Sequence, residues 1–240
     1  MNGLFGRLAL LAAIAAAVLV AAAGPAYRNG YVELMQAFEF MRWGSYAAMG
    51  AGALAVLWII FAIIGRSTAG LVTFLLALVI AGGAIYFPLS MRAQGAAVPA
   101  IHDITTDTNN PPVFVAVLPL RADAKNGSDY KTDPAEQAKA YPDIQTLVTD
   151  VPIGDMFARA EKTAREMGWE IVAAVPEDGR IEATDTTMWF GFKDDIVIRI
   201  TTDGTATRLD IRSMSRVGKS DLGKNAERIR AFLAKVKEAK

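Results

Sequence analysis

The chain has 240 residues, and its 25 basic and 25 acidic side chains give a formal net charge of zero, which predicts no affinity for nucleic acid. It contains no cysteine, which excludes disulfides, thiolate metal ligands and cysteine nucleophiles. Charge is sparse in residues 1–92, where arginine and glutamate are the only charged residue types, and dense beyond them. The sequence therefore predicts a membrane anchor over residues 1–92, joined to a soluble part.

Two uncharged runs in the anchor, 43–65 and 67–91, are each long enough to cross a bilayer as a helix. Only Gly65-Arg66-Ser67 separates them, so we expect a tight turn on the cytoplasmic side. The earlier apolar run, 8–23, fits either a retained helix or a cleaved signal peptide, and the anchor therefore has two or three transmembrane helices. With either reading, the residues after Arg92 face the periplasm and the protein resides in the cell inner membrane.

Between the first two apolar runs, aromatic and methionine side chains recur at helical spacing in "YRNGYVELMQAFEFMRW", residues 27–43. This pattern predicts an amphipathic helix lying in the membrane interface. A helix that docks a partner protein is the alternative.

After Arg92 the composition becomes polar, and residues 121–144 are rich in Pro, Gly, Asp and Lys. We expect this stretch to be a surface wrap or a mobile linker rather than a site. A helix follows over 153–167 and ends at Gly168; strands are then expected over 169–175, 180–192, 195–202 and 205–214, and a last helix begins near Asn225. This order predicts an α+β fold for residues 99–240: two layers, with an antiparallel four-stranded sheet and both helices on one face.

Alternation along the strands separates the two faces of this sheet. The core face is expected to carry Ile181, Ala183, Asp185, Thr187, Trp189, Ile196, Ile198, Ile200, Leu209 and Ile211. The opposite face is rich in arginine and hydroxyl groups, and its candidate ligand-binding residues are Arg199, Arg208, Arg212, Thr184 and Thr186. A hairpin turn at Asp203-Gly204 would place Arg199 opposite Arg208. The two arginines would repel each other, so negative charge must neutralise them. Glu182 and Asp210 could supply it, or an anionic ligand, a lipid head group or an acidic partner.

The Gly-Lys-Ser at residues 218–220 raises the question of a phosphate-binding loop. Such a loop needs a glycine five residues before the second glycine, and Ser213 stands there. It should also follow a buried parallel strand rather than a hairpin strand. We therefore interpret Gly218 and Gly223 as turn residues, with Ser220 or Asn225 capping the last helix.

Four ordered blocks, "HDITTD", "NNPPVF", "ATDTTMWFGFKDDIVIRI" and "SRVGKSDLGKNAERIR", resemble the bacterial and plastid family known as domain of unknown function 1499. The resemblance spans about residues 99–238 and leaves out the membrane anchor. It implies a domain facing the envelope or a lumen behind a signal or anchor, and it supplies no activity.

The first block holds the single histidine of the chain, His102, beside Asp103, and Asp107 follows four residues after Asp103. This group could provide a general base oriented by a carboxylate, or metal ligands, but each use needs further partners. A hydrogen-bonded loop is the structural alternative. Asp185, an acid on the apolar face, belongs to the same alternative polar site; as a structural residue it would lie at the sheet's end or pair with Arg216 or His102.

Two functions of different classes follow. The favoured one is a membrane-anchored extracytoplasmic binding or accessory domain for an envelope complex or an anionic lipid. The alternative is a His-dependent or metal-assisted envelope hydrolase. We expect no cofactor, no resident metal and no nucleic-acid partner; the expected partners are the lipid bilayer and a membrane protein complex or anionic lipid.

Overall fold

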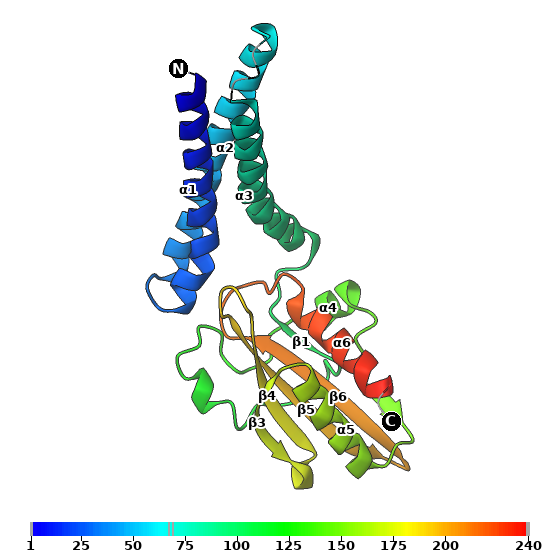
Figure 1. The fold of residues 1–240 in the computed structure, drawn as a ribbon. Coiled ribbons are helices and arrows are strands. Elements are labelled where there is room, and N and C mark those ends of the chain that lie inside the picture. The colour runs from blue at the N-terminus through cyan, green and yellow to red at the C-terminus, as the bar shows by residue number, and fades with distance from the viewer. Residues whose placement is uncertain (1, 67, 69, 239–240) are drawn as a thin grey trace. The chain divides into compact units, whose positions relative to one another are not determined.

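The structure is a computed structural model that describes residues 2–66, 68 and 70–238 (Figure 1). The chain divides into two compact units. The first takes in the residues up to Ala93 together with Met188–Gly191, and the second takes in Gln94–Thr187 and the residues from Phe192 onward.

The first unit contains the long helices α1 (Asn2–Arg28) and α2 (Leu34–Ile64) and all but the last four residues of α3 (Leu71–Ala97). All three are long and apolar enough to cross a membrane. Their mutual contacts are made by small side chains such as Ala13, Ala48 and Ala77, while many large apolar side chains point outward. This distribution suits helices that pack within lipid, where small residues let backbones approach each other.

The interfacial helix predicted over residues 27–43 is not a separate element, because its latter part is the first part of α2. Gly44 does not break the helix. A Cβ atom at this position would lie 2.7 Å from Cγ2 of Val20, so the glycine permits the close approach of α1 to α2.

The second unit is built on an antiparallel sheet of six strands, not four, in the order β1-β6-β5-β4-β3, with β2 also paired to β6. The strands are β1 (Asp103–Thr105), β2 (Leu147–Thr149), β3 (Glu170–Val175), β4 (Arg180–Thr186), β5 (Lys193–Asp203) and β6 (Ala206–Ser215). The helices and turns of this unit are η1 (Pro119–Arg121), α4 (Pro134–Ala140), α5 (Ile153–Glu166), η2 (Pro176–Asp178) and α6 (Lys224–Glu238). The sequence missed β1 and β2 because three residues are too few to show an alternating pattern.

Helices α5 and α6 cover one face of the sheet, as predicted (Figure 1). Trp169 stacks on Phe232 in the core between the helices and the sheet, with ring centroids 5.4 Å apart. The predicted core-face residues found there are Ile181, Ala183, Ile196, Ile198, Ile200, Leu209 and Ile211. Gly168, at a φ of +80°, ends α5 as expected. The prediction for Thr187 and Trp189 was wrong, because β4 ends at Thr186 and both residues lie in the loop before β5.

The hairpin between β5 and β6 turns one residue later than predicted. Asp203 pairs with Ala206, so the two turn residues are Gly204 and Thr205. Arg199 therefore lies opposite Asp210 rather than Arg208, which faces Thr201. Each residue of β5 therefore pairs with a β6 residue two positions later than predicted. A shift of two leaves the assignment of side chains to the two faces unchanged.

The face of the sheet away from α5 and α6 is covered by the segment 106–133, which we call the covering segment. Phe114 and Val117 from this segment form a small apolar cluster with Val197 and Met214. The polar stretch predicted as a wrap or linker includes part of this cover; it begins at the last residue of η1 and contains α4. The face that carries the candidate arginines thus lies largely beneath other parts of the chain.

Candidate functional site

Arg199 and Arg208 lie in a cluster of four charged side chains. Nη2 of Arg199 donates to Asp107 at 3.1 Å and to Asp210 at 3.0 Å. Arg208 donates to the same two carboxylates, each at 2.9 Å. Two positive and two negative groups therefore compensate each other. Of the two acids expected to neutralise this pair, Asp210 does so and Glu182 does not; Asp107 is the second acid.

Burial alone would raise the pKa of Asp210, but hydrogen bonds from Thr146, Arg208 and Arg199 outweigh burial and hold this pKa below its usual range. Asp107 also fixes its own loop, because its Oδ1 accepts the backbone N–H groups of Asn109 and Asn110. The third strand arginine on this face belongs to a different group of contacts.

Arg212 is 2 % exposed and makes a two-pronged contact with Asp103, at 2.9 and 2.7 Å. Its guanidinium also donates to the carbonyl oxygens of Pro112 and Ser128, in the covering segment. Its Cζ lies 4.8 Å from the ring centroid of Phe114. Burial raises the pKa of Asp103, and Arg212 acts in the opposite direction. Arg212 is therefore an internal residue that connects β6 to the covering segment.

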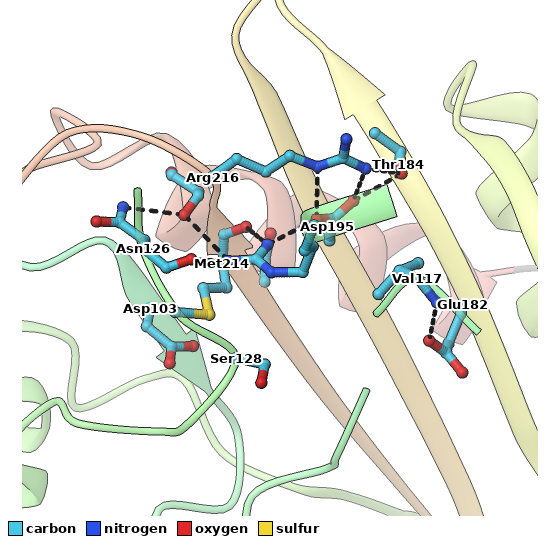
Figure 2. A network of polar contacts seen from close by, with 12 residues as sticks. Asp103, Val117, Asn126, Ser128, Glu182, Thr184, Asp195, Met214 and Arg216 are labelled. Carbon is cyan, nitrogen blue, oxygen red and sulfur yellow. Dashed lines mark hydrogen bonds and ion pairs between the residues drawn. The ribbon is translucent and has the colours of Figure 1, made fainter. Parts of the chain in front are cut away.

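Thr184 and Asp195 form a third group with Arg121, which the sequence analysis did not select, and with Arg216, which it named only as a possible partner of Asp185 (Figure 2). Arg121 donates to Asp195 at 2.6 Å, and Arg216 donates to both of its oxygens, at 2.8 and 2.7 Å. The Thr184 hydroxyl donates to the same carboxylate at 2.7 Å. Burial alone would raise the pKa of Asp195, but these hydrogen bonds together lower it. Thr184 is thus engaged inside the protein, whereas Thr186 is exposed at the end of β4.

Glu182, on β4, is fully buried, and its side chain binds the backbone of the covering segment. Its carboxylate accepts the N–H groups of Val115, Ala116 and Val117 at 3.0, 2.8 and 3.0 Å, and Figure 2 shows the last of these bonds. Arg180 donates to the same carboxylate. Three consecutive amides on one carboxylate fix the local backbone. Large apolar side chains of this stretch remain exposed: Val113 by 68 %, Val115 by 50 %, Leu118 by 42 % and Leu120 by 52 %.

The residues of the alternative polar site do not come together. Nδ1 of His102 lies 3.3 Å from the carbonyl oxygen of Lys219, while Asp103 binds Arg212 and Asp107 binds Arg199 and Arg208. His102 and Asp103 line a cavity of about 460 Å³ whose other charged residues are exposed and lie on loops, apart from Glu136 of α4. In the described part of the chain, no hydroxyl group hydrogen-bonds His102, and no three His, Asp or Glu side chains are grouped as metal ligands.

Asp185 lies at the end of β4, opposite Asp194, and its partner is neither Arg216 nor His102. Arg228 of α6 donates to Asp185 at 2.8 Å and to Asp194 at 2.7 Å. The sequence analysis missed Arg228. Its position on the apolar stripe of α6, next to Ile229 and one turn before Phe232, was the signal that could have identified it.

The loop after β6 has no phosphate-binding architecture, since β6 is antiparallel to its neighbours. Gly218 and Gly223 have φ angles of +94° and +81°, so both are turn residues as expected. The cap of α6 is Asp221, which accepts the N–H groups of Gly223 and Asn225. It is therefore neither Ser220 nor Asn225; the Asn225 side chain instead bonds Ser213 and Ser215.

A family model described as "Protein of unknown function (DUF1499)" matches residues 103–236, which is more than half of the chain. The chain belongs to the DUF1499 family. The match begins at β1 and ends within α6, so the family model covers the sheet domain and not α1, α2 or α3. A comparison with curated proteins finds no match.

Proposed function

We propose that this DUF1499 chain is a membrane-anchored binding domain that serves as an accessory factor for a protein complex of the cell envelope. Its three apolar helices hold it in the inner membrane, and its sheet domain faces the periplasm. The proposal is supported by the membrane-spanning length of α1, α2 and α3 and by the character of the sheet domain's surface.

The observation that carries the proposal is the exposed apolar stretch Val113–Leu120. Phe114 and Val117 anchor it from below, and Glu182 fixes its backbone, while the alternate side chains Val113 and Val115 point outward. Large apolar side chains that are exposed on a fixed backbone mark an interaction site, because their burial by a partner costs little conformational entropy.

The charges of the same face favour a protein partner over an anionic lipid. Arg199 and Arg208 are matched by Asp107 and Asp210, so an anionic head group would have to displace one of these acids. Arg212 is buried against Asp103. The arginines therefore offer a lipid phosphate no uncompensated positive charge.

The test is affinity purification of the full chain from native membranes into lipid nanodiscs, followed by quantitative mass spectrometry of proteins and lipids. Val115→Asp should lose the co-purifying protein partner, because a charge would have to be buried in the contact. Val148→Asp is the matched control, since Val148 of β2 is a valine of similar exposure, 56 % against 50 % for Val115. Retention of every partner by Val115→Asp would refute the proposal. If the double variant Arg199→Gln with Arg208→Gln no longer co-purifies with anionic lipid, lipid binding would replace protein binding as the proposed function.

The proposed orientation has its own test. A phosphatase reporter fused after the last residue should be active in the periplasm, and one inserted beside Arg66 should be inactive, because the turn between α2 and α3 would lie in the cytoplasm. A fluorescent protein that folds only in the cytoplasm should give the reverse pattern at both places. An active phosphatase beside Arg66 would invert the topology.

A further inference from the structure

The two edges of the sheet differ in how far their backbone N–H and carbonyl groups are hydrogen-bonded. At β1, the side-chain amide of Gln137 accepts the N–H of Thr105 at 3.0 Å and donates to the carbonyl of the same residue at 2.7 Å. The Thr132 hydroxyl donates to the carbonyl of Asp103 at 2.8 Å. Side chains thus occupy backbone groups that would otherwise be open to another strand.

The opposite edge is formed by β3, which pairs with β4 alone. Within the described residues, no side chain or loop hydrogen-bonds the backbone of β3 on its outer side. After Glu170 the strand reads Ile-Val-Ala-Ala-Val, with no lysine and no proline. A bulge between Ile171 and Ala173 is its one protective feature, and Ala173–Val175 continue in regular pairing beyond it.

The open edge lies beside the exposed apolar stretch described above. Val172 of β3 packs against the cluster of Phe114 and Val117. Ala173 pairs across the ladder with Glu182, whose carboxylate holds the amides of Val115 to Val117. A strand added to β3 would therefore also reach the apolar side chains of the covering segment.

Acidic side chains flank this edge at both ends. Glu170 precedes the apolar run, and Glu177 follows it; both are exposed. A second copy of the chain added antiparallel would bring Glu170 toward Glu177 of the other copy, and like charges at such positions repel. An extended segment with basic residues at its ends would instead be attracted.

We propose that β3 accepts an extended segment of a partner protein as a further strand of the sheet. The segment carries apolar residues that contact the covering segment, and it is bounded by lysine or arginine residues that pair with Glu170 and Glu177. Backbone hydrogen bonds supply affinity in this mode of recognition, and side chains supply specificity. The inference rests on the proposed binding function and names the way in which the partner binds.

The experiment uses the full chain in nanodiscs and synthetic peptides as probes. The main probe alternates valine with threonine and has lysines at both ends. One comparison peptide replaces a central threonine by proline, and another replaces the lysines by glutamates. Binding is measured by fluorescence anisotropy, and amide hydrogen exchange by mass spectrometry locates the contact.

The lysine-flanked peptide should bind and should slow exchange in residues 170–175, while the proline-containing peptide should not. The double variant Glu170→Lys with Glu177→Lys should reverse the preference between the two peptides. The affinity for the lysine-flanked peptide should fall roughly fivefold, and the glutamate-flanked peptide should bind more tightly. Glu136→Lys with Glu227→Lys is the matched control, because it changes the net charge equally at exposed positions on α4 and α6.

Equal binding of the proline-containing peptide, or protection outside β3, would overturn the strand-addition proposal. Dimerisation through β3 without any peptide would also overturn it, since the occupant would then be a second copy. These failures differ from failure of the proposed function. If Val115→Asp still loses the native partner, the binding function stands and only its mode is wrong.

Discussion

Both faces of the sheet are largely covered, but the helix-covered face is mostly apolar and the other face carries many charged residues. On the helix-covered face, Ile198 and Ile211 have no exposed surface and belong to the apolar core. On the other face, Glu182 and Asp210 have no exposed surface, and Arg212 is 2 % exposed. Buried charge of this kind is costly unless it is paired and hydrogen-bonded.

The difference follows from what covers each face. Helices α5 and α6 satisfy most of their own backbone groups, so the strands beneath them need only apolar side chains. The covering segment is irregular, and its buried carbonyl and N–H groups need partners from the sheet. Arg212 and Arg121 donate to carbonyl groups such as those of Pro112 and Gly127, and Glu182 accepts three N–H groups. A row of charges on one strand face can therefore serve a loop of the same chain rather than a ligand.

The sharpest test of this comparison is Arg212→Met, which removes a large and almost fully buried charged side chain from the polar face. We expect a loss of about 3–5 kcal/mol in the free energy of unfolding, because Asp103 is left buried without a counter-charge. The measurement is pulsed hydrogen exchange of the full chain at increasing urea, read from peptides of the sheet domain. Asp103→Leu together with Arg212→Met should recover part of the loss. A loss below about 1 kcal/mol for the single variant would contradict the structural role.

A second test separates the effect of the negative charge of Glu182 from the effect of its side-chain shape. Glu182→Gln should lower the free energy of unfolding by about 2–3 kcal/mol, because the amide group turns donors toward the N–H groups of Val115 to Val117. Glu177→Gln is the matched control at an exposed position and should stay within about 0.5 kcal/mol of wild type. The same urea titration measures both variants. Equal values would show that the covering segment does not depend on this carboxylate.

Much of the helix-covered face could be predicted from sequence. The strands β4, β5 and β6 alternate, Gly168 marks the end of α5, and parity assigned the isoleucines correctly even though the hairpin turn was misplaced by one residue. Parity survives such an error because both pairings keep the same residues on each face.

The polar face could not be predicted in the same way, because its partners lie far apart in the chain. Asp107 meets Arg199 across 92 residues, and Arg121 meets Asp195 across 74. No local pattern encodes such contacts, and the covering segment reads as a loop from composition alone. The arginines were visible in the sequence, but the acids that neutralise them could not be chosen from several candidates.

The pH dependence of stability offers a smaller effect that belongs to the polar face alone. An unfolded aspartate has a pKa of about 4, and the pKa of Asp210 in the folded protein lies below its usual range. The stabilisation from Asp210 is therefore complete above about pH 4 and is lost as the pH falls through the folded pKa. Asp210→Asn should lower the free energy of unfolding by about 1–2 kcal/mol at pH 7 and flatten its decline below pH 4. Urea titrations from pH 7 to pH 3 measure this; an unchanged slope would show that other acids dominate.

The smallest expected effect comes from an ion pair outside both faces. Glu161 and Arg165 lie one turn apart on α5, with 2.6 Å between Oε1 of Glu161 and Nη2 of Arg165. Their side chains are 29 % and 59 % exposed. Water screens such a pair, and ordering two long side chains offsets much of the attraction, so a double-mutant cycle with Glu161→Gln and Arg165→Gln should give a coupling of only about 0.3–0.5 kcal/mol. High salt should reduce this coupling further, whereas the coupling between Asp103 and Arg212 should hardly change. A salt-resistant coupling on α5 as large as that of the buried pair would mean that burial is not what distinguishes the charges of the polar face.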